Sequence, residues 1–169
     1  MGGQALSEGN GMTGKEELLA SFDDVLSNKW DSIESILKGI SEEEVLYQNP
    51  VYSKEEREVG HPLSGTILWH IVHLADCYQW YKGKIISRPE KPVQLPPPEV
   101  QNLAEGITNL KLHRTELRDC ISSLSEDQLG EKLYDGKTVS DLARASVRHD
   151  AWHGGQIAVA RRLYRMRDV

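Results

Sequence analysis

Two histidines, His149 and His153, stand four residues apart in a segment with helical periodicity. At 100° per residue they lie one turn apart, on the apolar stripe that includes Leu142 and Ala160. Two imidazoles at this spacing can bind one metal ion, and Gln156 follows a further turn along. The alternative is a pair of core histidines satisfied by hydrogen bonds. The pattern favours metal, because both rings would otherwise need polar partners away from water.

A third ligand has to come from another helix, and the predicted helix at 66–84 offers His70 and His73. The apolar stripe of that helix places His70 near its centre and His73 nearer its edge. Periodicity therefore slightly favours His70. His61, in a predicted loop, and His113, on the flank of another helix, are expected to be ordinary surface or boundary histidines.

The spacing of apolar residues predicts four long helices. They run from about Thr13 to Gly39, from Thr66 to Lys84, from Val100 to Leu124, and from a capping Ser140 towards the C-terminus. Residues 47–65 and 85–98 are rich in proline or glycine and predict long connections. We therefore expect an all-α fold, a four-helix bundle with long crossover loops, over residues 15–169. Residues 1–14 are expected to be a disordered extension.

The composition argues against several classes of function. The chain has 169 residues, with 26 Asp plus Glu against 20 Lys plus Arg and a net charge of −6. This acidic balance argues against a nucleic-acid partner. The longest apolar run, Ile157–Ala160, argues against a membrane span.

Cys77 and Cys120 lie in helical patterns, which favours a reducing compartment, and we expect a cytoplasmic protein. A core of this size needs no metal for stability, so a metal site would indicate function.

Two motifs resemble the DinB/YfiT superfamily of four-helix metal proteins. One is Thr66 followed by the run His73–Asp76, and the other is the run His149–Ile157. The likeness extends over most of residues 15–165 in helix order and loop character.

The resemblance implies that His73, His149 and His153 are the metal ligands. His70 then becomes the nearby alternative or a pocket residue. From its place one turn beyond His153, Gln156 is expected to bond a ligand imidazole or the substrate, or to be an ordinary buried amide. Three neutral imidazoles suit Zn²⁺ or Ni²⁺ and leave positions for water or substrate. Some members of the superfamily are S-transferases that use low-molecular-weight thiols, and others are maleylpyruvate isomerases.

Two functions remain open at this point. The first is a metal-dependent enzyme acting on a small molecule, either a thiol S-transferase or a related metal-assisted transferase or hydrolase. The alternative is a non-catalytic, stress-associated metal-binding or sensor bundle.

Other side chains are expected to be structural. Asp150 is predicted to be a helix-surface charge or a partner for arginines on neighbouring turns. The apolar flank of Cys77 favours inert packing. Glu42–Glu44 are expected to be solvated loop charges. Trp69 and Trp80 form a second stripe on their helix, which predicts a homodimer.

Overall fold

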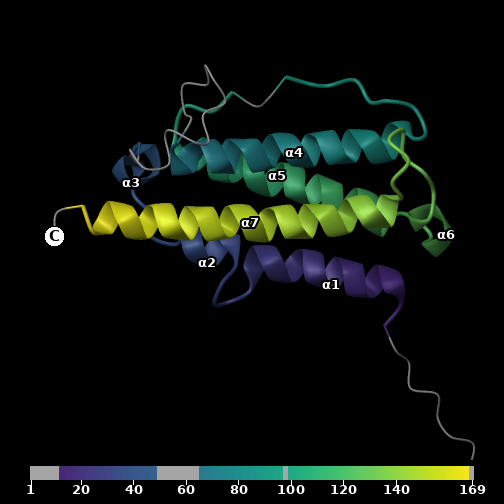
Figure 1. Cartoon of the computed structure of the whole chain (residues 1–169), viewed down its shortest axis with the longest axis horizontal. Helices are drawn as coiled ribbons and strands as arrows, with labels where there is room; N and C mark the ends of the chain where they lie inside the picture. The colour runs from purple at the N-terminus through teal and green to yellow at the C-terminus, as the bar shows by residue number, and fades with distance from the viewer. Residues whose placement is uncertain (1–11, 49–64, 97–98, 168–169) are drawn as a thin grey trace, which may run out of the picture.

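The computed structural model describes residues 12–48, 65–96 and 99–167. Four long helices pack side by side and three short helices join or flank them (Figure 1). The helices are α1 (Gly14–Ser27), α2 (Ile33–Leu37), α3 (Glu42–Leu46), α4 (Ile67–Ser87), α5 (Leu103–Ser122), α6 (Glu126–Leu129) and α7 (Val139–Arg165). The prediction of an all-α bundle is confirmed. The predicted extension 1–14 lies largely outside the described residues and stays a prediction.

The first helix is shorter than its apolar pattern indicates. The prediction of one helix from Thr13 to Gly39 is wrong, because α1 ends at Ser27 and α2 begins at Ile33. The side-chain oxygen of Asn28 accepts the backbone N–H groups of Trp30 and Asp31, at 2.8 and 3.0 Å. These local bonds replace the backbone hydrogen bonds that would continue α1, and Ser32 then caps α2.

α4 and α5 run parallel, and the segment after Ser87 returns along the bundle to connect them (Figure 1). The predicted crossover at 85–98 is therefore confirmed, although α4 extends three residues beyond its predicted end at Lys84. The two helices approach closely at Gly106, where a Cβ would lie 3.0 Å from Leu68 Cδ1. Most of the predicted 47–65 connection lies outside the described residues.

α4 and α7 are antiparallel neighbours and carry the candidate site. Thr66 caps α4, and Thr138, not the predicted Ser140, caps α7 through a reciprocal pair of bonds with Asp141. Apolar side chains of all four long helices form one core between them. The fully buried members include Phe22, Leu68, Ile71, Leu74, Tyr78, Ile121, Val139 and Ile157.

The C-terminal part of α7 holds the short helices in place. Arg161 donates to Glu44 Oε1 at 2.9 Å and to the backbone oxygens of Ile36 and Lys38, the latter at 2.9 Å. Glu44 is buried, so its predicted role as a solvated loop charge is wrong. Burial of this carboxylate is tolerated because Arg161 pairs with it.

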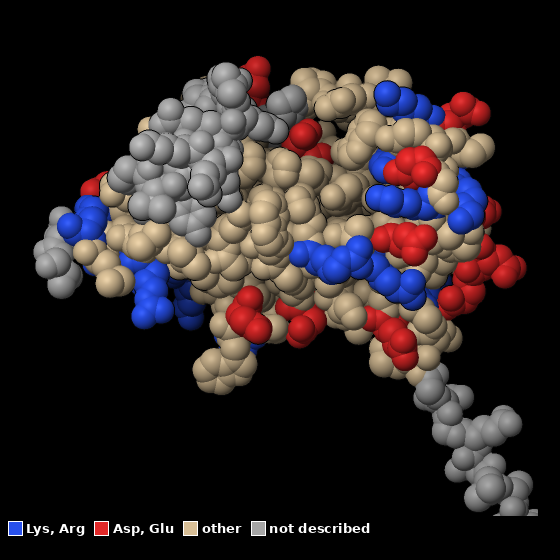
Figure 2. All heavy atoms as spheres, viewed as in Figure 1, with Lys and Arg blue, Asp and Glu red and all other residues tan. Residues whose placement is uncertain are grey.

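Acidic and basic side chains are mixed on the face shown in Figure 2, mainly towards the end of the bundle where α6 lies. No single-sign patch dominates this face. Among the described helices, none combines the length and hydropathy that crossing a membrane requires.

Candidate metal centre

Four histidines from two helices meet between α4 and α7. We call His70, His73, His149 and His153 the histidine cluster. Neighbouring ring centroids lie between 4.5 Å, for His149 and His153, and 5.3 Å, for His73 and His149. His70 and His153 are buried, whereas His73 and His149 are half-buried at the outer edge. His70 therefore points inward, as the helical wheel predicts. His73 lies beside the pair on α7, and its role as a metal ligand stays a prediction.

The closest contacts within the cluster join ring nitrogens to ring nitrogens. His153 Nε2 lies 3.0 Å from His149 Nε2, and His153 Nδ1 lies 2.9 Å from His70 Nδ1. A neutral imidazole has one N–H and one lone pair, so His153 can donate to one neighbour and accept from the other. His149 Nδ1 is buried and has no hydrogen-bond partner among the described residues. The cluster therefore brings several ring nitrogens close together.

The environment keeps these rings neutral. Burial is the largest cause that lowers the pKa of His70 and of His149 to about 4, and nearby His73 lowers both further. Burial, followed by the neighbouring histidines, lowers the pKa of His153 to about 2. Near pH 7 the rings therefore hold their lone pairs, which is the state that binds a metal ion.

Cys77 joins this group one turn after His73. Its Sγ lies 3.6 Å from His73 Nε2. Ligand atoms of His73, Cys77 and His149 all lie within 4.8 Å of one another, so these three could hold one ion. The sequence interpretation of Cys77 as inert packing missed this. The i, i+4 spacing from His73 was the available signal. Whether His153 shares an ion with His73 and His149 stays a prediction.

Two tryptophans flank the cluster. The Trp69 ring stacks on the His73 ring, with centroids 4.9 Å apart and planes 7° from parallel. Trp152 stacks on His149 at 6.2 Å and contacts His153 edge-on. These contacts limit rotation of the imidazoles at the outer edge. They were not predicted, because Trp69 was expected at a dimer face.

Asp150 lies inside the bundle, so its prediction as a helix-surface charge is wrong. Its Oδ1 accepts the Tyr78 hydroxyl at 2.7 Å, and its Oδ2 lies 3.4 Å from Arg114 Nε. Arg114 also donates to the backbone oxygen of Phe22. We call Tyr78, Asp150 and Arg114 the Asp150 network. Burial raises the pKa of Asp150 to about 6, although the Arg114 charge and the Tyr78 hydrogen bond lower it. The arginine comes from α5 rather than from neighbouring turns of α7.

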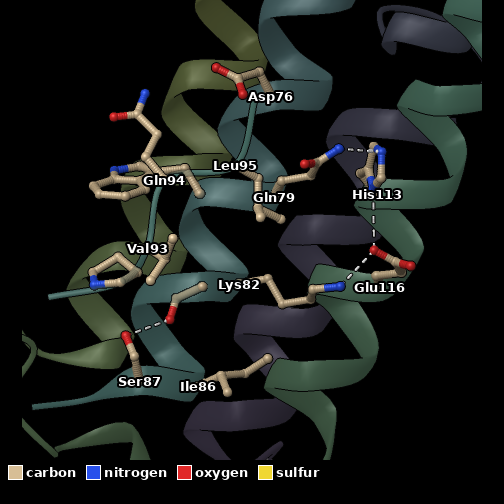
Figure 3. Close-up of a pocket in the computed structure, with 13 residues that line it drawn as sticks. Asp76, Gln79, Lys82, Ile86, Ser87, Val93, Gln94, Leu95, His113 and Glu116 are labelled. Atoms are coloured by element: carbon tan, nitrogen blue, oxygen red, sulfur yellow. Dashed lines mark hydrogen bonds and ion pairs between the residues drawn. The ribbon is translucent and has the colours of Figure 1, made fainter. Parts of the chain in front are cut away.

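A separate cavity of about 490 Å³ lies on the other side of α4, against α5 and the segment after Ser87 (Figure 3). None of the four clustered histidines lines it. Its polar side chains bond to one another: Gln79 lies 2.6 Å from His113 Nε2, and Lys82 donates to Glu116 at 2.7 Å. The polar side chains of the cavity are already paired with one another, so the histidine cluster is the better candidate site.

Three other residues considered in the sequence analysis are His113, Gln156 and His61. His113 is half-buried on α5, is bonded to Gln79 and Glu116, and lies outside the histidine cluster. Gln156 is half-buried on α7, and its predicted role stays a prediction. His61 lies outside the described residues.

The fold and the site define an all-α bundle with a group of side chains able to hold a metal ion. The donor set fits a divalent cation, because it brings neutral imidazoles and a thiol together beside a buried ring nitrogen without a partner. The family model of the DinB superfamily matches residues 26–157, and the chain belongs to that superfamily. Searches of curated proteins and of solved structures gave no significant match.

Proposed function

We propose that this protein is a metal-dependent enzyme, of the thiol S-transferase type or a related metal-assisted transferase or hydrolase. His73, His149 and His153 hold a divalent ion, Zn²⁺ or Ni²⁺, and the substrate is a small molecule. The observation that carries the proposal is the 3.0 Å separation of the Nε2 atoms of His149 and His153.

That separation is close to what one shared ion requires. Two imidazole nitrogens bound to a tetrahedral zinc ion are about 3.3 Å apart, given Zn–N bonds of about 2.0–2.1 Å. The His73 ring lies 4.9 Å from the His153 ring and 5.3 Å from the His149 ring, so it can supply the third nitrogen from the opposite helix. His70 then has a supporting role: its Nδ1 accepts the Nδ1 proton of His153, which directs the lone pair of His153 Nε2 to the ion.

The proposed chemistry depends on a metal ion bound at the edge of the core. A bound divalent cation lowers the pKa of a coordinated thiol or water and so supplies a nucleophile near neutral pH. His73 and His149 are half-buried, which lets a small molecule reach this edge, while buried His70 and His153 keep water from the inner side. Trp69 and Trp152 offer apolar walls on which a substrate can lie.

The test is a screen of electrophiles paired with low-molecular-weight thiols, run on zinc-loaded, nickel-loaded and metal-free protein. We expect at least one thiol–electrophile pair to be turned over by loaded protein and to lose its turnover when the metal is removed. Full activity of the metal-free protein would overturn the proposal. His113→Ala is the matched control, because it removes a half-buried histidine outside the cluster and should leave turnover unchanged.

Two further assignments belong to this proposal. The enzyme acts in the cytoplasm, where thiol cofactors are kept reduced. It forms a homodimer, which light scattering of the purified chain would test. Nucleic acid and membrane are not among its partners.

A further inference from the structure

Cys77 occupies a position that the three-histidine arrangement does not use. It follows His73 by one turn on α4, and its Sγ lies 3.6 Å from His73 Nε2. A thiolate sulfur and an imidazole nitrogen bound to the same tetrahedral zinc ion are about 3.6 Å apart, given bonds of about 2.3 and 2.0–2.1 Å. The observed separation therefore equals the spacing of two ligands of one ion.

The surroundings of the sulfur support the same role. A ligand atom of His149 lies within 4.8 Å of both Cys77 Sγ and the His73 nitrogen. The Trp69 ring lies flat on the His73 ring and keeps it beside the sulfur.

We propose that Cys77 Sγ is a fourth protein ligand of the ion held by the histidines, and that it occupies the position a substrate thiol would take. This inference rests on the proposed function. His73 and Cys77 supply two ligands from α4, and His149 and His153 supply two from α7. Cys77 and an outside thiol compete for one position, and Cys77 Sγ lies 3.6 Å from His73 Nε2. A thiolate in the ligand set also favours Zn²⁺ over harder cations such as Mg²⁺.

The test uses Co²⁺ as a spectroscopic probe in full-length, tag-free protein. Cys120→Ser is the parent, so that Cys77 is the only thiol. We expect Co²⁺ binding to the parent to produce a near-ultraviolet thiolate-to-cobalt charge-transfer band. The Cys77→Ser variant of that parent should keep visible cobalt absorption from the histidines, lack the band, and bind Co²⁺ about tenfold or more weakly.

The outcomes separate the two proposals. Cobalt bound to the parent without the charge-transfer band would overturn the role of Cys77 and leave the histidine site intact. No cobalt binding by the parent, with circular dichroism showing a folded chain, would overturn both.

Thiol reactivity gives a second readout that does not depend on cobalt. We expect zinc to slow the reaction of Cys77 with iodoacetamide in the Cys120→Ser parent by about tenfold or more, because a metal-bound thiolate is shielded. An unchanged rate at saturating zinc would overturn the proposal. Competition is tested by adding 2-mercaptoethanol to cobalt-loaded Cys77→Ser protein. The charge-transfer band should then return, and its failure to return would show that no outside thiol reaches the position.

Discussion

Two groups of polar side chains lie in the bundle beside α4 and α7, and they differ in how their atoms are paired. In the Asp150 network, the Tyr78 hydroxyl donates to Asp150, and the Arg114 charge lies beside the same carboxylate. In the histidine cluster, the closest contacts join one ring nitrogen to another. The network pairs a cation with an anion, whereas the cluster brings like groups together.

This difference indicates what each group does. The pairing of a buried cation with a buried anion can be explained by folding alone, because each charge offsets the other away from water. Ring nitrogens brought together from two helices are better explained by a cation that accepts several of their lone pairs at once. Breaking the network should therefore lower stability, whereas breaking the cluster should mainly change metal binding.

The largest expected effect comes from Arg114, which is only 1% exposed. Arg114→Met should lower the free energy of unfolding by about 3–5 kcal/mol, because it leaves the Asp150 carboxylate buried without its countercharge. Urea unfolding measures the change. The control is Arg118→Met, which breaks the half-exposed pair between Arg118 and Asp23 and should cost about 1 kcal/mol or less. Equal costs for the two variants would remove the contrast between a buried network and a surface pair.

The next largest effect is expected on zinc affinity, and it tests the role of His70 in the cluster. His70→Phe keeps most of the side-chain volume but removes the acceptor for His153 Nδ1. Zinc affinity, measured by competition with a chromophoric chelator, should fall about 10- to 100-fold. His113→Phe is the matched control and should not change the affinity. Complete loss of binding in His70→Phe would mean that His70 is a ligand, and unchanged affinity would mean that it does not orient His153.

A smaller effect is expected at an ion pair between buried Lys84 and more exposed Asp135. Lys84 donates to Asp135 at 2.6 Å, and this hydrogen bond lowers the pKa of Asp135 from its ordinary value of 3.8. The pair therefore contributes stability fully above pH 3.8, and the contribution is lost as the pH falls through the lowered value. Asp135→Asn should cost about 1 kcal/mol at pH 7. Urea unfolding at decreasing pH should show the difference from the parent closing below about pH 4, and a constant difference would contradict the assignment.

Much of the fold could be predicted from the sequence because apolar periodicity records which face of each helix is buried. The break at Asn28 could not be predicted in this way. The bonds that Asn28 makes to Trp30 and Asp31 are local, and apolar residues continue at helical spacing beyond them. The Thr138 cap was missed for a similar reason, since Ser140 is an equally acceptable capping residue by type.

The candidate site could be predicted in part. The inward direction of His153 follows from helix geometry, which does not show that His149 is half-buried at the outer edge. The burial of Asp150 does not, because a wheel gives the centre of an apolar stripe and not its width. α7 packs against α1, α2 and α4, so its buried arc is wider than one stripe. Arg114 stood between Leu110 and Leu117 on the core face of α5, a signal that could have identified the network.

The most direct test of the account is the zinc content of tag-free protein compared with its His149→Ala variant. His149 contacts His153 and also lies in the group with His73 and Cys77, so both descriptions of the site need it. The account predicts about one zinc ion per chain after equilibration and gel filtration. It predicts none in the variant under the same conditions, with the helical circular dichroism signal retained. Zinc-free parent protein, or a variant that holds zinc as firmly as the parent, would contradict it.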